Sequence, residues 1–135
     1  MLDSFRFALD GVMHVFRTQR HMRFHFFMVV LVLTLAKVYR LNRTELLVLF
    51  FSICFVLITE MFNTAVEAVI DMITQNYHPL AKRAKDVAAG AVLIASINAV
   101  VVGFLLFLDD ARIREVLARA YTGSPPSMIR AAVIE

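Results

Sequence analysis

The sequence lacks the residues and motifs on which several familiar kinds of site depend. It holds a single cysteine, Cys54, so neither an intrachain disulfide nor a cysteine-based metal site is available. It contains no G-x-x-x-x-G-K-S/T phosphate loop and no H-R-D or D-F-G kinase motif, which excludes the familiar nucleotide-binding folds. No small-residue cleavage site follows the first apolar segment, so we expect no removable signal peptide. Any nucleotide site in this chain must be built in another way.

Charged residues are also scarce, at 19% of the 135 residues, whereas hydrophobic residues reach 60% and the mean hydropathy is +0.73. Soluble domains are roughly 45 to 50% apolar, and a domain of this length could not bury the excess. A bilayer accepts about 20 apolar residues for each helix that crosses it. The composition therefore indicates an integral membrane protein with one domain of a few helices.

The formal net charge of +3 does not indicate nucleic-acid binding, because the basic residues are divided among short segments that flank apolar runs. Such segments suit lipid head groups and the phosphates of ATP. Lys and Arg are balanced between the two expected sides of the membrane, so the positive-inside rule by itself does not decide the orientation.

The pattern of apolar residues predicts an all-α membrane fold. From Leu2 to Phe16 the apolar side chains fall within a sector of about 80° at 100° per residue, which predicts an amphipathic helix lying on the membrane or packed on other protein. Three apolar runs then predict transmembrane helices at about 24–39, 45–71 and 87–108. The expected architecture is therefore one surface helix followed by three spans.

Residues 1–108 are expected to form this membrane domain, and residues 109–135 a C-terminal tail that begins with a charged helix from Asp109 to Tyr121. Within the third span, small residues recur at every fourth position and let helices approach closely in lipid. They are Ala91, Ala95, Ala99 and Gly103. We expect tight helix association, either within the chain or between copies.

A polar stripe runs along the second span. Its members share one helix face within about 80°, given the spacings of three, four and four residues. They are Glu60, Asn63, Glu67 and Asp71. Ionisable groups inside a span cost about 2.5 to 3.5 kcal/mol each, so the stripe needs water, an ion or a partner. Glu60 lies within the hydrocarbon and could accept the proton of a lipid hydroxyl, whereas Asp71 is equally well explained as a solvated interface residue.

Basic residues gather at the start of the third predicted span. Lys82, Arg83 and Lys85 precede Asp86, and the amides of a helix N-terminus also suit phosphate. Phosphoryl transfer mainly needs positioning, charge neutralisation and one base, so this cluster beside the carboxylates fits ATP with Mg²⁺. By itself the cluster would be read as an ordinary positive flank of a span.

Three strings in this region closely resemble the prokaryotic diacylglycerol kinase family, which includes the undecaprenol kinases. They are Glu60-Met-Phe-Asn-Thr-Ala-Val-Glu-Ala-Val-Ile-Asp71, Tyr77-His-Pro-Leu-Ala-Lys82 and Ala84-Lys-Asp-Val-Ala-Ala-Gly-Ala-Val-Leu93. The resemblance extends from about Phe5 to Leu108. It rests on the pattern E-x-x-N-S/T-A-I/V-E-x-x-x-D together with A-K-D, which is specific to the family.

The resemblance implies an ATP-dependent lipid kinase with Mg²⁺ as cofactor. It also implies a homotrimer of three-span subunits in the bacterial cytoplasmic membrane, with shared active sites that face the cytoplasm. Carried over by position, Glu60 resembles the general base and Glu67 a Mg²⁺ ligand. The implied lipid contacts are Glu60, Asn63, Arg23 and Ala89. The implied ATP contacts are Phe7, Gln19, Glu67, Asn76, Tyr77, His78, Lys85 and Asp86.

Gln19 is a departure from the family pattern, because a second metal-binding glutamate commonly stands at this position before the first span. A glutamine can coordinate a metal through its carbonyl oxygen but brings no charge. The affinity for Mg²⁺ is therefore expected to be weaker, unless a neighbouring residue or water completes the ligand shell.

Other functions remain compatible with the residues. The carboxylates would also serve a small transporter or channel that binds and releases cations. A catalytically silent membrane scaffold is a further alternative, for which Gln19 is the one positive sign. His14, His21 and His25 share a helical face and could bind a transition metal, although solvated interfacial histidines explain them more simply.

The lipid substrate is not decided by the sequence, because diacylglycerol and undecaprenol both present a primary hydroxyl at head-group level. The segments 76–82 and 87–93 read closer to the short Gram-positive-like branch of the family. They favour undecaprenol without deciding it.

Overall fold

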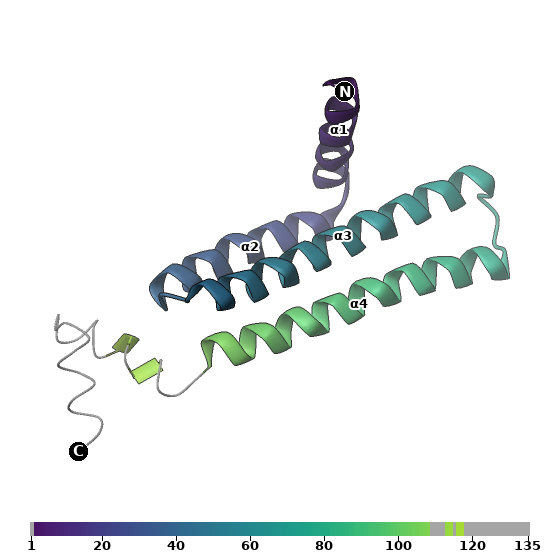
Figure 1. Cartoon of the computed structure of the whole chain (residues 1–135). Coiled ribbons are helices and arrows are strands. Elements are labelled where there is room, and N and C mark those ends of the chain that lie inside the picture. The colour runs from purple at the N-terminus through teal and green to yellow at the C-terminus, as the bar shows by residue number, and fades with distance from the viewer. Residues whose placement is uncertain (1, 109–112, 115, 118–135) are drawn as a thin grey trace, which may run out of the picture.

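The structure is a computed structural model that describes residues 2–108, 113–114 and 116–117. This part of the chain contains four long helices, α1 (Leu2–Thr18), α2 (Arg20–Val38), α3 (Arg43–Ile73) and α4 (Pro79–Phe107). The all-α prediction is confirmed, and α2, α3 and α4 are each long and apolar enough to cross a membrane (Figure 1). The tail from 109 to 135, with its predicted helix, lies almost entirely outside the described residues.

The helices begin earlier than the apolar runs do, because polar residues cap and extend them. At the start of α3 the Asn42 side chain accepts a hydrogen bond of 3.1 Å from the Glu45 amide. The Glu45 carboxylate in turn accepts one of 2.8 Å from the Asn42 amide. This reciprocal capping box satisfies two amides that a helix start otherwise leaves unpaired. At the start of α4, His78 Nδ1 accepts a hydrogen bond from the Leu80 amide, and Pro79 occupies the first helical position.

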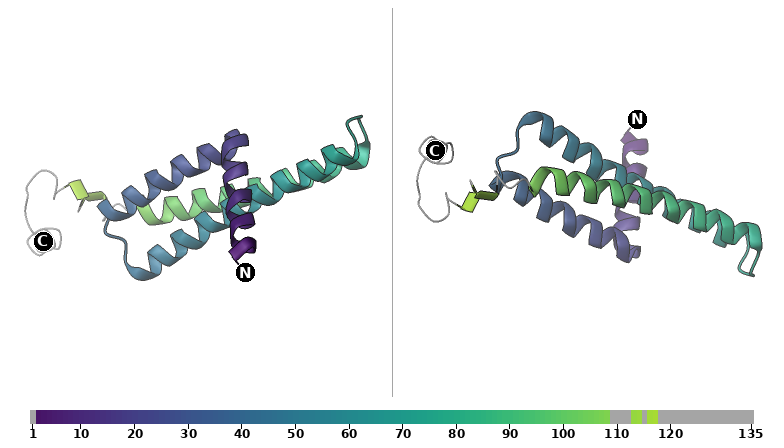
Figure 2. Two further views of the ribbon diagram at one scale, coloured as in Figure 1. Left: turned by 90° about the horizontal axis from the view of Figure 1, so that it is seen from above. Right: turned by 90° about the horizontal axis from the view of Figure 1, so that it is seen from below.

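The helices α3 and α4 form an antiparallel hairpin and pack along each other, while α2 packs against α3 (Figures 1 and 2). The main buried apolar cluster lies at the end away from the α3–α4 loop and contains Ala36, Leu41, Leu49 and Phe107. The ring of Tyr39 meets the ring of Phe107 edge to face, with centroids 5.5 Å apart. Most other large apolar side chains are exposed, as helices that face lipid require.

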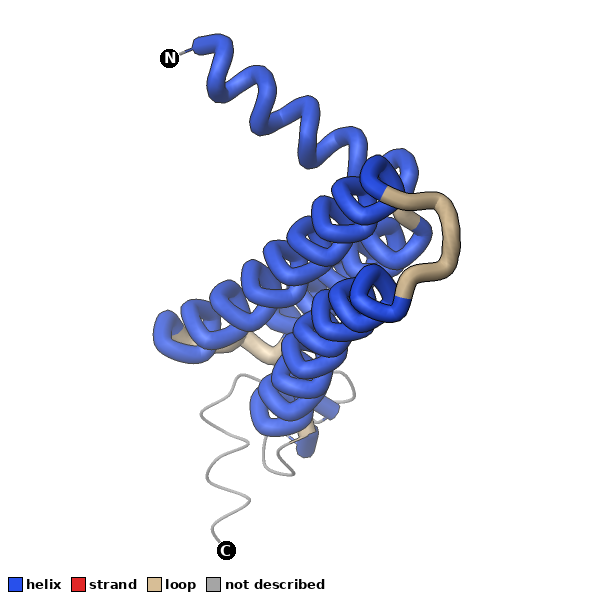
Figure 3. The backbone as a smooth tube through the Cα atoms, turned by 90° about the vertical axis from the view of Figure 1, so that its right-hand side faces the viewer, coloured by secondary structure: helices blue, strands red, loops and turns tan. Residues whose placement is uncertain are grey.

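The helix α1 leaves the other three at a steep angle and points away from them (Figure 3). Its base is held by Phe16, whose ring meets that of Phe26 edge to face at 5.0 Å, and by the buried Val15. The predicted helix is therefore present. Its position on a membrane surface stays a prediction.

The hairpin is longer than a bilayer core. The 31 residues of α3 extend about 46 Å at about 1.5 Å per residue, against a hydrocarbon thickness of about 30 Å. In Figure 2 the α3–α4 hairpin continues well past α1 to the loop at residues 74–78. One end of the hairpin must therefore stand outside the hydrocarbon.

Candidate functional site

Glu60 is a buried residue whose carboxylate has no protein partner among the described residues. Its side chain lies on α3 and the residue is only 4% exposed, although it is ionisable. Thr64 donates a hydrogen bond of 3.0 Å to the Glu60 backbone carbonyl and leaves the carboxylate untouched. Among the described residues, no hydrogen bond or ion pair reaches the Glu60 carboxylate. Burying such a group without a partner is costly, so the carboxylate is placed to meet a ligand.

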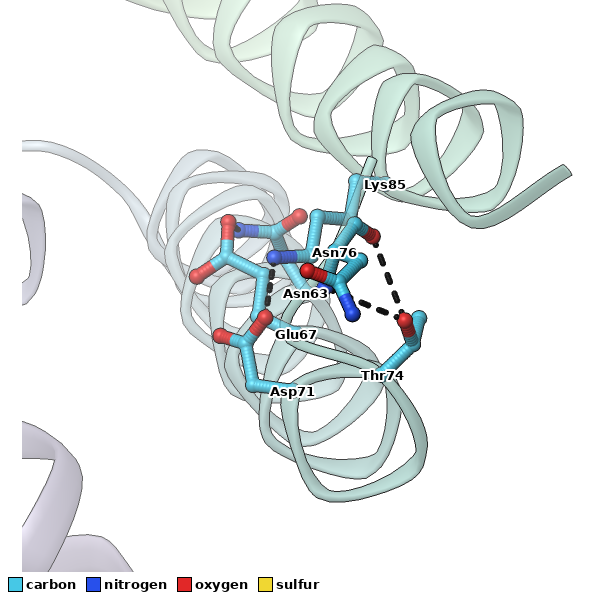
Figure 4. Close-up of polar contacts among 6 residues, drawn as sticks. All are labelled: Asn63, Glu67, Asp71, Thr74, Asn76 and Lys85. Atoms are coloured by element: carbon cyan, nitrogen blue, oxygen red, sulfur yellow. Dashed lines mark hydrogen bonds and ion pairs between the residues drawn. The ribbon is translucent and has the colours of Figure 1, made fainter. Parts of the chain in front are cut away.

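One turn further along α3, Asn63 and Glu67 form a second polar unit. Asn63 Nδ2 donates a hydrogen bond of 3.1 Å to Glu67 Oε1 (Figure 4). The amide oxygen of Asn63 is buried and has no hydrogen-bond partner within the described part of the chain. Buried amide oxygens are nearly always paired in folded proteins, so an unpaired one at this place is suited to bind a ligand.

Two ion pairs lie near the loop end of the hairpin, and one of them joins its two helices. Lys85 on α4 reaches across to α3, where its Nζ atom lies 2.5 Å from Asp71 Oδ1 (Figure 4). Lys82 pairs with Asp86 at 2.6 Å, one turn along the same helix. The first pair connects the last turn of α3 to the second turn of α4, whereas the second pair is local.

The loop between α3 and α4 is shaped by its own polar groups. Thr74 Oγ1 donates to the Asn76 carbonyl at 3.2 Å, and the Asn76 amide donates back to Thr74 Oγ1 at 3.2 Å. His78 uses Nδ1 to cap α4, and the Tyr77 side chain stands 80% exposed beside it. The first turn of α4 thus presents its amides toward this loop, in a position that suits an anionic group.

A cavity of about 300 Å³ lies at this end of the hairpin. It gathers five residues that the family resemblance assigned to ATP: Asn76, Tyr77, His78, Lys85 and Asp86. Asp71 and Lys82 also line it. The sequence placed Lys82 in the basic cluster that suits ATP, whereas it explained Asp71 equally well as a solvated interface residue. The position of Asp71 at the end of the polar stripe on α3 was a signal that it could pair with Lys85.

A second groove, of about 670 Å³, runs between α3 and α4 further from the loop. Its walls are almost entirely apolar, with Thr59, Asn63 and Arg83 as the polar residues. Asn63 therefore stands between an apolar groove and the Glu67 carboxylate. Such an arrangement suits a molecule with a long apolar chain and a polar end.

The remaining predicted site residues lie elsewhere in the single chain. Phe7 is exposed on α1, Gln19 is the N-cap of α2, Arg23 is exposed on α2, and Ala89 is exposed on α4. No hydrogen bond or ion pair within the described residues joins the first three to Glu67 or to the loop. In Figures 1 and 2, α1 also lies well away from the α3–α4 loop. One chain alone therefore leaves α1, the helix that carries Phe7, away from the loop.

The donor set fits a hard divalent cation such as Mg²⁺ that is shared with a phosphate ligand. No three His, Cys, Asp or Glu side chains gather into a metal site among the described residues, the three N-terminal histidines included. Magnesium, however, is usually held by one or two carboxylates together with substrate phosphates and water. Glu67 leaves one carboxylate oxygen free of the bond from Asn63. That oxygen and the Asn63 carbonyl are ligands of the required kind.

Known proteins resemble this chain over most of its length. The sequence profile described as prokaryotic diacylglycerol kinase matches residues 6–107. A diacylglycerol kinase of Synechocystis sp. is 50% identical over 109 residues, which are 80% of this chain and 62% of that protein. The undecaprenol kinase of Bacillus subtilis is 38% identical over 105 residues, or 78% of this chain and 85% of that protein. A diacylglycerol kinase of Escherichia coli is 49% identical over 55 residues, covering 41% of this chain and 45% of that protein.

This chain thus spans less than two thirds of the Synechocystis relative but most of the Bacillus one. The profile covers the three helices that could cross a membrane, the loop and most of α1. The resemblance inferred from the three sequence strings is confirmed, and the chain belongs to the prokaryotic diacylglycerol kinase family.

Proposed function

We propose that the protein is a membrane lipid kinase that transfers the γ-phosphate of ATP to the hydroxyl of diacylglycerol or undecaprenol. Family membership supports this, since the relatives above are named for these two activities. The carboxylate of the buried residue Glu60, which has no partner in the described part of the chain, carries the proposal at the level of chemistry. A lipid hydroxyl that enters the hydrocarbon end of the site would give this carboxylate its missing hydrogen-bond partner.

In the proposed reaction, Glu60 accepts the proton of the lipid hydroxyl as its oxygen attacks the γ-phosphorus. A new bond forms between the lipid oxygen and phosphorus, and the bond from phosphorus to the β-γ bridging oxygen breaks. ADP leaves with that electron pair, and the proton stays on Glu60 until it passes to solvent. General-base assistance of this kind typically contributes about 10² to 10⁴ in rate.

The loop cavity is the proposed ATP site. Lys85 and the first amides of α4 would bind phosphate, and Asn76, Tyr77 and His78 would contact the nucleotide together with Asp86 and with Phe7 of α1. Bound Mg²⁺ would neutralise charge on the phosphates. Glu67 and Gln19 are the proposed ligands of that ion, and Asn63 orients the Glu67 carboxylate through its hydrogen bond.

The apolar groove between α3 and α4 is the proposed place for the lipid chain. Asn63 lines this groove one helical turn from Glu60, so a lipid lying in the groove could present its hydroxyl near the base. Arg23 and Ala89 are further proposed lipid contacts. The Synechocystis relative is named for diacylglycerol and the Bacillus relative for undecaprenol. An assay with each lipid distinguishes these two candidate substrates.

We further propose a homotrimer with sites shared between subunits, in the bacterial cytoplasmic membrane with the loop on the cytoplasmic side. Within one chain, α1, which carries Phe7, lies away from the α3–α4 loop (Figures 1 and 2). This separation supports sharing, because a neighbouring subunit could supply Phe7, Gln19 and Arg23. A cytoplasmic loop also gives the cavity access to ATP. The product would be a phosphorylated lipid that serves phospholipid or envelope lipid-carrier metabolism.

The test is an assay of purified protein in lipid bilayers with ATP and Mg²⁺, in which diacylglycerol and undecaprenol are offered separately. Phosphate transfer to one of them is expected, with loss of at least about 10²-fold in kcat for Glu60→Gln. Glu45→Gln is the matched control on the same helix, because glutamine keeps the capping box intact. Its turnover should equal that of the wild type.

No transfer to either lipid would overturn the proposal. Ion or substrate flux without ATP would then favour a transporter or channel, and the absence of both flux and ATP binding would favour a silent scaffold. Equal turnover of wild type and Glu60→Gln would leave the kinase class standing but remove Glu60 as the base.

A further inference from the structure

Asp71 is the last residue of the polar stripe on α3. Its side chain contacts the opposite helix, whereas the bond between Asn63 and Glu67 lies within α3. It forms an ion pair of 2.5 Å with Lys85, which is 14 positions away in the sequence and belongs to the opposite helix. The Asp71 side chain is 62% exposed and that of Lys85 is 36% exposed. Asp71 is thus the more exposed partner of the pair, and both side chains line the loop cavity.

A lysine needs such a partner if its ammonium group is to stay in one place. Its four-carbon stem has many rotamers, and their restriction costs entropy when a ligand binds. An ammonium group has three N–H donors, so the bond to Asp71 leaves two of them for another acceptor. The pair therefore fixes the ammonium group at the wall of the cavity without using up its capacity to bind phosphate.

The pair between Lys82 and Asp86 shows the contrast. It joins residues four apart on one helix, and both side chains are 61% exposed. That pair does not connect the two walls of the cavity. Only the bond between Asp71 and Lys85, among the ion pairs of the described residues, crosses from α4 to α3.

We infer that Asp71 is a positioning residue for ATP. This inference rests on the proposed function. Asp71 holds the Lys85 ammonium group where two of the lysine N–H donors meet the phosphates of ATP. Asp71 itself contacts neither ATP nor lipid. It acts only through Lys85. This assigns a role to a residue that the sequence explains equally well as a solvated interface carboxylate.

The test separates ATP from lipid. Asp71→Asn keeps the shape and removes the charge, and it should raise the KM for MgATP about ten-fold while the KM for lipid changes less than about two-fold. Asp71→Glu keeps the charge on a stem one methylene longer and should recover most of the loss. Glu45→Gln, which removes a carboxylate at the far end of α3, is the matched control and should leave both KM values unchanged.

A double-mutant cycle provides the second readout. In a Lys85→Gln background, the Asp71→Asn change should have no further effect on the KM for MgATP, because Asp71 acts only through Lys85. A role limited to holding the hairpin together would instead lower thermal stability and leave the KM for MgATP in place. Additive effects, or an equal change in both KM values, would overturn the inference. So would tighter ATP binding in Asp71→Asn, which would make Asp71 a competitor of phosphate.

Failure of the kinase proposal can be told apart from failure of this inference. Binding of a fluorescent ATP analogue with Mg²⁺, measured without lipid on the intact protein in detergent, needs no turnover. If the wild type binds the analogue, Asp71→Asn should bind about ten-fold more weakly and Asp71→Glu nearly normally. If the wild type does not bind it, both the nucleotide site and the role of Asp71 are refuted.

Discussion

Asn98 on α4 donates a hydrogen bond of 3.4 Å to the hydroxyl of Ser52 on α3, within the apolar part of the hairpin. Ser52 is buried, whereas Asn98 is exposed at the edge of the helix pair. Hydrocarbon offers neither group another hydrogen-bond partner. The bond therefore fixes how far α3 and α4 can slide along each other.

This bond gives a stability prediction. Ser52→Ala should destabilise the protein by about 1 kcal/mol, because it leaves the Asn98 amide unsatisfied. In a double-mutant cycle with Asn98→Leu, the coupling energy should be about 0.6 kcal/mol, measured by thermal unfolding in detergent. Strictly additive effects would show that the two side chains do not interact. Lipid phosphorylation should be unaffected at permissive temperature.

The unpaired amide oxygen of Asn63 gives a prediction in which a substitution lowers activity without lowering stability. Asn63→Leu is close in shape and removes a buried polar atom that has no partner in the described structure, so the thermal stability should stay equal or rise. Turnover should fall by at least about ten-fold, since Glu67 loses the donor that orients it. A variant that is both active and unchanged in stability would remove Asn63 from the site.

Gln19 gives a prediction about magnesium. Gln19→Glu should lower the Mg²⁺ concentration needed for half-maximal activity several-fold, because it adds a charged oxygen ligand. Glu67→Gln should raise that concentration, and excess Mg²⁺ should restore part of its activity but none of the activity lost in Glu60→Gln. The measurement is a magnesium titration at fixed ATP. If Gln19→Glu has no effect, residue 19 is not near the metal.

Arg40 gives a prediction at the far end of the molecule. Its φ of 51° places a residue with a side chain in the left-handed region, in the short turn between α2 and α3. Such a conformation costs about 1 to 2 kcal/mol, against about 0.5 to 1 kcal/mol for the extra freedom that glycine gives the unfolded chain. Arg40→Gly should therefore raise stability by up to about 1 kcal/mol without altering activity. Arg43→Gly, at the first position of α3, is the control and should lower stability.

Hydropathy and helical periodicity predicted most of the fold. The spans expected at 24–39 and 45–71 lie within α2 and α3 apart from the C-cap Tyr39, and the last lies within α4 up to its C-cap Leu108. The earlier starts of α2 and α3 were missed because the apolar pattern does not register the polar residues that begin these helices. The same-face spacing from Glu60 to Asp71 follows from helical geometry, so the Asn63–Glu67 bond could have been anticipated.

The contacts between helices could not be predicted in this way. The pairing of Asp71 with Lys85 depends on how the loop at 74–78 turns and on the register of α4 against α3, neither of which periodicity encodes. For the same reason, the sequence alone did not reveal that Asp71 and Lys82 line the loop cavity.

The length of α3 has a kinetic consequence for the proposed kinase. Glu60 and Asp71 are about 16 Å apart along one helix, at about 1.5 Å per residue, so a single rigid element extends from the hydrocarbon to the water outside it. The lipid would reach Glu60 by two-dimensional diffusion within its leaflet, while ATP arrives at the loop from bulk solution. The rate should then follow the mole fraction of substrate lipid in the bilayer. Diluting the vesicles in buffer at constant composition should leave it unchanged.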